Sequence, residues 1–330
     1  MPAAPRALVR STSRRTLRLL AGTALAIALG AALLLVPHTA SATDPVTLTS
    51  GFYVNPDSSP AVWARDNPGD PRAARIQSSI GARPIARWFG TGSSATSVAS
   101  YAGAADSHDK LPVLVAYSIP GRDACGGHSG GGAGSVGAYR TWIASFAAAI
   151  GTKPAVVVIE PDALGDFACM SSTQIQERLD MLRYATEQFQ EKAPNTFAYL
   201  DGGNAGWVAP AVMAGRLDSA GVHNVRGFSV NVSNYYTTAA SLSYASAVNT
   251  SLGGGAGYVV DTSRNGNGSN GEWRNPAGRK LGTPAQTGEG ADMLLWVKTP
   301  GNSDGQCGIA PADPAGQFSP DLAVRLIDGV

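Results

Sequence analysis

The sequence VVVIEPDALGDF, at residues 156–167, places three carboxyl groups within the eight residues that follow four branched aliphatic ones. A continuous aliphatic run is typical of a parallel strand buried on both faces. Six more short apolar runs recur along the chain, at residues 83–89, 111–117, 196–201, 227–232, 257–262 and 293–298. Strand–helix alternation over seven units predicts an α/β fold, a distorted parallel barrel in one domain.

Two of the stretches between these runs have clear helical patterns, at residues 137–151 and 172–192. Ser172 or Thr173 can cap the second helix, and Pro194 lies just beyond its end.

Polar residues follow six of the predicted strands, and five strands supply an aspartate: Asp123, Asp162, Asp201, Asp261 and Asp304. Asn231 and Asn234 end a further strand, and Lys298 ends the strand that Asp304 follows. A single aspartate in this place is often a helix N-cap. Five in separate units predict a cleft lined by carboxylates, at the C-terminal ends of the strands, where barrel enzymes hold their active sites.

Tryptophans fall near the same strand ends, at Trp88, Trp207 and Trp273. Each could simply pack in the core, but aromatic faces beside carboxylates and amides suit a sugar ligand. The glycine-rich segment at 126–134 lacks the glycine spacing of a phosphate-binding loop, so we interpret it as a flexible loop over the cleft.

The first 42 residues have the pattern of a secretory signal peptide. They contain a basic head with Arg14 and Arg15, an apolar run from Leu19 to Val36, and Ala40-Ser41-Ala42. The paired arginines suggest twin-arginine export, and an uncleaved membrane anchor is the alternative. Cleavage would leave a domain at 43–330 with 20 basic and 24 acidic residues, a net charge of −4. This balance argues against nucleic acid and membranes as partners of the secreted, extracellular protein.

Three cysteines remain after the signal: Cys125, Cys169 and Cys307. Export implies an oxidising compartment, so we expect one disulfide and one leftover thiol. Cys125 and Cys169 both follow predicted strands, which favours their pairing. A metal site is a weaker alternative because no C-x-x-C or H-x-x-x-H spacing exists, and no cofactor is expected.

Eight motifs together resemble those of glycoside hydrolase family 6, the inverting β-1,4-glucanases. In chain order they are FYVNP (52–56), YSIPGRDAC (117–125), VVIEPD (157–162), YLDGGNAGW (199–207), NVSNY (231–235), DTSRNGNG (261–268), EWRNPAGRKLGTP (272–284) and LWVKTPGNSDGQC (295–307). They cover nearly the whole chain after the signal. The resemblance implies a distorted barrel with a cleft across one face and the activity of a secreted bacterial endo-β-1,4-glucanase.

The resemblance implies that Asp162 is the general acid, and that Asp123 supports its raised pKa. Asp201 matches a third carboxylate that tunes or holds this cluster. Asp304 matches the candidate base that activates water, with a water chain to Asp123 as the alternative. Inversion needs such a second carboxylate on the opposite face of the sugar.

Further positions of the family match residues that bind or distort the sugar. These are Tyr117, Ser129, Trp88, Trp207, Trp273 and Lys298, and we add Asn204, Asn231, Asn234 and Asn302 as substrate-binding candidates.

Three positions depart from the family. Asn204 stands where His is frequent, and Asn302 stands where Glu is usual, so two ionisable groups are missing near the site. Arg274 stands where Cys is usual, which leaves Cys307 without its expected partner. The resemblance therefore also implies a Cys125–Cys169 bridge and a free Cys307.

Loop lengths favour internal cutting of the glucan, because the segment between Trp273 and Lys298 is short. We expect the protein to be a monomer. A cellobiohydrolase of the same family is the first alternative, and a non-catalytic glucan-binding barrel is the second. An esterase is disfavoured because no G-x-S-x-G motif occurs and only His108, His128 and His223 follow the signal.

Overall fold

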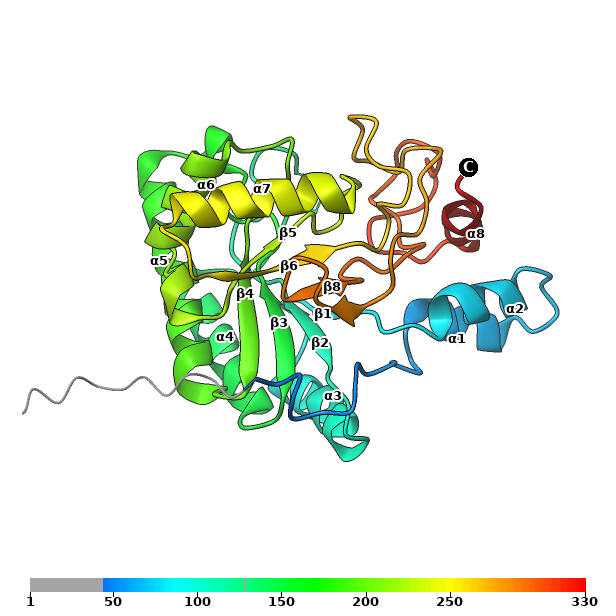
Figure 1. The fold of residues 1–330 in the computed structure, drawn as a ribbon, viewed down its shortest axis with the longest axis horizontal. Helices are drawn as coiled ribbons and strands as arrows, with labels where there is room; N and C mark the ends of the chain where they lie inside the picture. Colours follow the sequence, from blue (N-terminus) through cyan, green and yellow to red (C-terminus); the bar gives the residue numbers. More distant parts are fainter. Residues whose placement is uncertain (1–43, 128) are drawn as a thin grey trace, which may run out of the picture. The chain divides into compact units, whose positions relative to one another are not determined.

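The computed structural model describes residues 44–127 and 129–330, so the predicted signal peptide lies outside the described residues. Eight strands form one sheet in this part of the chain, in the order β1-β2-β3-β4-β5-β6-β8-β7 (Figure 1). Their bounds are β1 Arg87–Phe89, β2 Val113–Ala116, β3 Ala155–Ile159, β4 Thr196–Asp201, β5 Gly227–Val230, β6 Gly257–Asp261, β7 Gln286–Thr287 and β8 Met293–Leu295.

The seven predicted strands are confirmed, and each pairs with its neighbour in parallel. The short β7 was not predicted and pairs antiparallel with β8. No ladder joins β1 to β8 among the described residues, and a single backbone bond spans this seam, from Ala86 N to the oxygen of Trp296 at 2.9 Å. The sheet is therefore the distorted parallel barrel that the sequence predicts, and the structure adds that the barrel is incompletely closed.

Side chains alternate between the two faces of the sheet, as the pleat of a strand requires. In β3, Val157 and Ile159 pack in the outer layer against the helices. Val156 and Val158 face the barrel interior with apolar residues of the other strands. Both faces are thus buried, which accounts for the unbroken aliphatic run.

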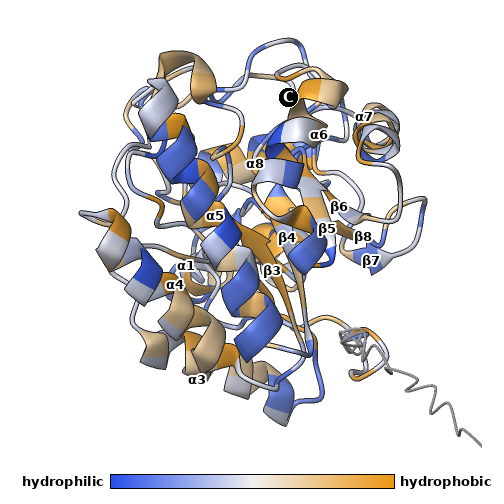
Figure 2. Cartoon of the chain, turned by 90° about the vertical axis from the view of Figure 1, so that its left-hand side faces the viewer, coloured by the Kyte–Doolittle hydropathy of each residue, from blue (hydrophilic) through white to orange (hydrophobic). Residues whose placement is uncertain are grey.

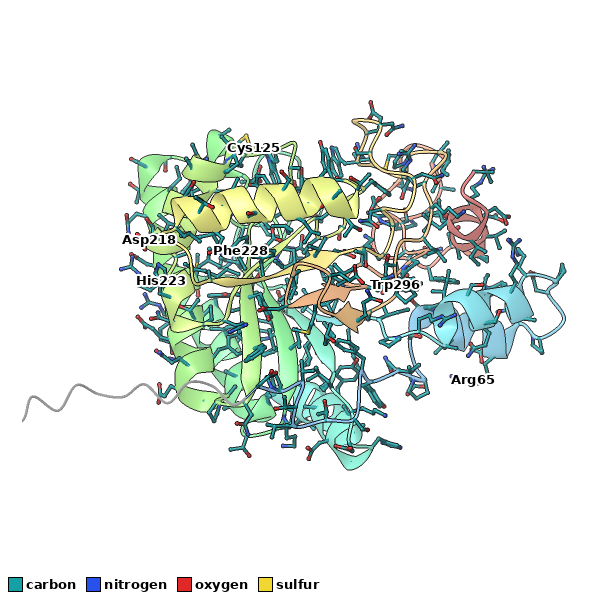
Figure 3. The ribbon with its side chains drawn as sticks, in the orientation of Figure 1. Arg65, Cys125, Asp218, His223, Phe228 and Trp296 are labelled. Carbon is teal, nitrogen blue, oxygen red and sulfur yellow. A yellow bond between two sulfur atoms is a disulfide. The ribbon has the colours of Figure 1, made fainter. Side chains whose placement is uncertain are left out.

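Helices α3 to α7 cover the outer face of the sheet and turn hydrophilic residues outward (Figures 1 and 2). A second group, α1, α2 and α8, packs on a small core that includes Trp296 (Figure 3). The bounds are α1 Ser59–Asp66, α2 Ala73–Ile76, α3 Ala95–Ser107, α4 Val136–Ile150, α5 Ser172–Lys192, α6 Pro210–Ser219, α7 Thr238–Ser251 and α8 Pro320–Asp328. None of the described helices is long and apolar enough to cross a membrane.

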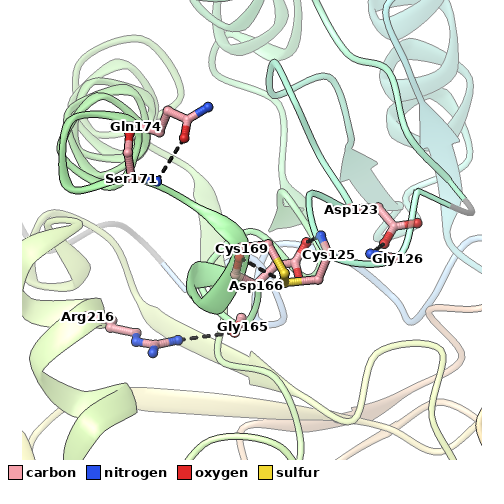
Figure 4. The surroundings of a disulfide bond; sticks show 9 residues. All are labelled: Asp123, Cys125, Gly126, Gly165, Asp166, Cys169, Ser171, Gln174 and Arg216. Atoms are coloured by element: carbon pink, nitrogen blue, oxygen red, sulfur yellow. Dashed lines mark hydrogen bonds between the residues drawn. A yellow bond between two sulfur atoms is a disulfide. The ribbon is translucent and has the colours of Figure 1, made fainter.

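Helix α5 begins one residue earlier than the proposed caps imply. Its N-cap is Ser171, which forms a capping box with Gln174, so neither Ser172 nor Thr173 is the cap (Figure 4). A glutamine three residues after a serine is the sequence signal for this arrangement.

Backbone strain is concentrated at the C-terminal ends of the strands. Five of the eight left-handed residues other than glycine in the described chain lie there: Asp123, Glu160, Asp162, Asn231 and Ser233, with φ between 50° and 70°. Such a conformation costs about 1–3 kcal/mol at a residue with a side chain, and it persists only where its surroundings enforce it. The strained residues therefore indicate a functional site at the C-terminal ends of the strands.

The loops after β2 and β3 are joined by a disulfide between Cys125 and Cys169, which confirms the predicted pair (Figure 4). Asp166 adds a second link, because its carboxylate accepts from the Cys125 N–H at 2.8 Å. Cys307 is a free thiol, also as predicted.

Replacing both bridged cysteines, Cys125→Ser with Cys169→Ser, should lower the free energy of unfolding by about 2–4 kcal/mol, since the bridge closes a loop of 44 residues. Guanidinium unfolding followed by tryptophan fluorescence measures the change. Cys307→Ser is the matched control and should leave the unfolding midpoint nearly unchanged. Equal midpoints for all three proteins would show that the bridge does not stabilise the fold.

Candidate active site

A cleft of about 1120 Å³ opens at the C-terminal ends of the strands. Twelve of the fourteen residues predicted for catalysis or substrate binding line it: Trp88, Tyr117, Asp123, Ser129, Asp162, Asn204, Trp207, Asn234, Trp273, Lys298, Asn302 and Asp304. Trp88 lies in β1 and the other eleven follow six different strands, so the parallel topology brings them together.

The other two predicted residues lie beneath the cleft. Asn231 is buried, and its side-chain nitrogen donates to the backbone oxygens of Asp261 at 2.8 Å and Tyr236 at 3.1 Å. Its amide is therefore committed inside the protein, and the structure does not place it among the substrate-contacting groups. Asp201 is 2% exposed and lies behind Asp162.

Asp162 follows β3 in a left-handed turn, and its backbone N–H donates to the Asp201 carboxylate at 2.9 Å. Burial raises the pKa of Asp162 well above its ordinary value, and the charges of Asp201 and Asp123 raise it further, against the opposing effect of Lys298. Burial also raises the pKa of Asp201, although the N–H groups of Asp162 and Gly203 oppose this. Asp162 is thus a carboxyl group held in its neutral form.

Asp123 is connected to Tyr117 through Ser129. The Asp123 carboxylate accepts from the backbone N–H of Ser129 at 2.6 Å and from its hydroxyl at 3.3 Å. The Tyr117 hydroxyl donates to the Ser129 hydroxyl oxygen at 3.1 Å. Figure 4 shows the further contact from the Gly126 N–H to Asp123. These contacts form a polar chain along one wall of the cleft.

Asp304 is held as an anion by two cations. Its side chain is 6% exposed, with Lys298 Nζ 3.0 Å from one oxygen and Arg264 Nη1 2.8 Å from the other. Tyr235 donates to the second oxygen at 3.1 Å. Burial acts to raise the pKa of Asp304, but Arg264 and Lys298 outweigh it, and the pKa lies below its ordinary value. Asp162 and Asp304 are therefore a neutral and an ionised carboxyl group in the same cleft, the pattern of an acid and a base with separate roles.

Aromatic side chains provide flat apolar surfaces in the same cleft. Trp207 is 43% exposed and Trp273 is 46% exposed, which is unusual for such large apolar groups. Trp207 rests on the backbone of Gly165, where an added Cβ would lie 2.4 Å from the ring. Trp88 packs edge-on against Tyr117, with ring centroids 5.2 Å apart. Exposed tryptophan faces beside carboxylates are suited to stacking on sugar rings.

The two asparagines at positions that depart from the family lie in the cleft and carry local bonds. Asn204 accepts from the Gly206 N–H at 3.0 Å, and Asn302 accepts from the Ser59 hydroxyl at 3.1 Å. Neither adds a charge to the site.

Sequence reasoning missed two contributors. Arg264 is buried against Asp304, although it stands in a motif that we had singled out. The sequence patterns assign no role to Asp166, yet it lines the cleft. The signal for Arg264 was its position directly after a strand that ends in aspartate, where a buried cation would need an anion beside it.

Known proteins resemble most of the chain. A family model described as "Glycosyl hydrolases family 6" matches residues 48–329. Endoglucanase 1 from Streptomyces halstedii is 57% identical over 296 residues, which cover 88% of this chain and 92% of that protein. Endoglucanase 1 from Streptomyces sp. (strain KSM-9) is 45% identical over 276 residues, covering 81% and 75%.

Solved structures are also similar, among them the endoglucanase Cel6 from Mycobacterium tuberculosis in complex with methyl-cellobiosyl-4-deoxy-4-thio-β-D-cellobioside. The TM-score is 0.79 with 38% sequence identity, over 87% of this chain and 99% of that one.

The raised pKa of Asp162 has a consequence for stability. Because the folded state binds this proton more tightly than the unfolded state, stability falls as the pH rises above the ordinary value of 3.8. Asp162→Asn should therefore melt at a higher temperature than the parent at about pH 8, and at nearly the same temperature at about pH 4. Calorimetry at the two pH values measures the difference.

Asp180→Asn is the control, because Asp180 is exposed on α5 and its carboxylate accepts from a neutral group, Gln176 Nε2, at 2.9 Å. It should show no such pH dependence. A melting temperature of Asp162→Asn below that of the parent at both pH values would contradict the assignment of a costly buried charge.

Proposed function

The chain belongs to glycosyl hydrolase family 6, and we propose that it is an endo-β-1,4-glucanase that cuts internal bonds of a β-1,4-glucan with inversion at the anomeric carbon. The observation that carries the proposal is the pairing of a neutral Asp162 with an ionised Asp304 in one tryptophan-lined cleft. The endoglucanase names of its relatives agree with it.

Asp162 donates a proton to the glycosidic oxygen of the leaving sugar. A general acid must still be protonated at the working pH, and the burial of Asp162 beside Asp201 supplies that condition. Asp201 holds the Asp162 backbone and adds a nearby negative charge. Its role is therefore to position and tune the acid without touching the substrate.

Water attacks from the opposite face of the sugar and must lose a proton. Asp304 is the candidate base because it is ionised, but its lowered pKa and its two cationic partners make it a weak one. The chain from Tyr117 through Ser129 to Asp123 offers a second route for this proton. In either case the negative charge of Asp304 favours the positive charge that develops on the sugar.

Internal cutting is favoured by an accessible cleft. Trp207 and Trp273 are both more than 40% exposed, and the only regular elements between Trp273 and Lys298 in the described chain are the short strands β7 and β8, of two and three residues. A cellobiohydrolase, the alternative, needs long loops that roof the cleft. A polymer can therefore enter this cleft from the side rather than by its end.

Hydrolysis of carboxymethyl-cellulose, followed by viscosity and by reducing ends, tests the activity. We expect a rapid loss of viscosity per bond cut, an α-anomer as the first product, and a loss of kcat of at least about 100-fold in Asp162→Asn, since no other group would supply the proton. The exposed control Asp180→Asn should keep the parent kcat.

Three results would count against parts of the proposal. An unaffected Asp162→Asn variant would remove the acid assignment. A β-anomer as the first product would exclude inversion, and slow viscosity loss with rapid release of reducing ends would indicate the exo-acting alternative.

The location of the protein is a separate proposal: residues 1–42 are cleaved as a secretory signal and the remaining chain acts outside the cell as a monomer. It rests on the arginine pair, the apolar run and the Ala40-Ser41-Ala42 sequence. N-terminal sequencing of protein from the culture medium should begin at Thr43. Recovery of the chain only in the membrane fraction would favour the uncleaved anchor.

A further inference from the structure

Asp261 is a fully buried carboxylate at the end of β6. It accepts four backbone hydrogen bonds. One oxygen accepts from the N–H groups of Ser233 at 2.9 Å and Lys298 at 3.0 Å. The other accepts from Ser263 at 2.9 Å and Val297 at 3.2 Å. No role in the proposed reaction has been given to this residue.

The four N–H groups belong to three segments, which follow β5, β6 and β8. Each of these segments also supplies a side-chain donor to Asp304. Tyr235 lies two residues after Ser233, Arg264 lies directly after Ser263, and Lys298 is itself one of the four. The side-chain partners of Asp304 are thus carried by backbone that Asp261 holds.

Ser233 links Asp261 directly to Arg264. Its backbone N–H donates to Asp261, and its backbone oxygen accepts from the Arg264 guanidinium. Ser233 is left-handed, with φ of 58°, so its conformation depends on such support. Loss of the Asp261 anion would therefore release Ser233 and loosen Arg264 at the same time.

We propose that Asp261 is a positioning residue for Asp304, acting through the backbone of Ser233, Ser263 and Lys298. The inference rests on the proposed function, because Asp304 matters only if the cleft cleaves a glucan. A carboxylate is needed here because its two oxygens accept without donating. In an asparagine, one of these oxygens becomes an NH2 group that faces two backbone N–H donors, so two of the four hydrogen bonds would be lost.

A double-mutant cycle on kcat tests the route, with Asp261→Asn, Asp304→Asn and the double variant assayed on carboxymethyl-cellulose. We expect Asp261→Asn in the parent chain to lower kcat by at least about tenfold. In the Asp304→Asn variant, the same substitution should lower kcat by less than about twofold. KM should change little in either case, since Asp261 does not line the cleft. The cycle is repeated with Lys298→Met in place of Asp304→Asn, which tests the same route at a second residue.

The matched control is Asp292→Asn, at the opposite end of the sheet. Asp292 precedes β8 and accepts from the Tyr199 hydroxyl at 2.9 Å and Arg226 Nε at 2.8 Å. It should lower the melting temperature and leave kcat unchanged in both backgrounds. Asp261→Ser is the second variant, for the case that Asp261→Asn does not fold, because a short hydroxyl can still accept from these N–H groups.

The outcomes separate the two claims. If the parent chain does not hydrolyse the glucan, the proposed function fails. If the parent is active but Asp261→Asn or Asp261→Ser lowers kcat by the same factor with and without Asp304, Asp261 stabilises the fold only and the positioning role is overturned.

Discussion

Buried carboxylates that accept backbone N–H groups at the strand ends are the interaction on which the cleft depends. Parallel strands diverge where they leave the barrel, so the backbone N–H groups just beyond each strand have no partner in the sheet. Buried N–H groups nevertheless need a hydrogen-bond acceptor. Glu160 accepts from Ser118 at 2.8 Å, Asp201 accepts from Asp162, and Asp261 accepts from four such groups. Each acid attaches the loop after a neighbouring strand to its own strand, so the ends keep fixed positions without a ladder.

Burial also shifts the pKa values of the two central acids, Asp162 and Asp304, and the position of the nearby cations decides whether each pKa rises or falls. Asp162 has three acidic neighbours, Asp201, Asp123 and Asp166, and the opposing cation Lys298, so desolvation dominates and its proton is retained. Asp304 contacts both Arg264 and Lys298, which outweigh desolvation, and its proton is lost. Lys298 therefore acts on both acids, and its placement by the backbone after β8 is part of the electrostatic balance.

The sequence predicted the barrel and most of the cleft for different reasons. Aliphatic runs report burial on both faces directly, so seven strands could be found, while β7, with two residues, is too short for a pattern. The roles of Asp162 and Asp304 came from the family resemblance, since many acids follow strands. The direction of a side chain in a left-handed turn has no period in the sequence, which is why Asn231 was expected in the cleft although it is buried beneath it.

The stretch that begins VVVIEPD shows how one strand end serves two purposes. Glu160 and Asp162 are both left-handed, with φ of 50° and 70°, on either side of Pro161. A left-handed residue with a side chain is strained, so the backbone at Glu160 needs support, and its carboxylate supplies it by accepting from the N–H groups that follow β2. Burial raises the pKa of Glu160 to about 7, a cost in stability at neutral pH. In return, the hydrogen bonds of the buried Glu160 carboxylate fix the turn from which Asp162, two residues later, reaches the cleft.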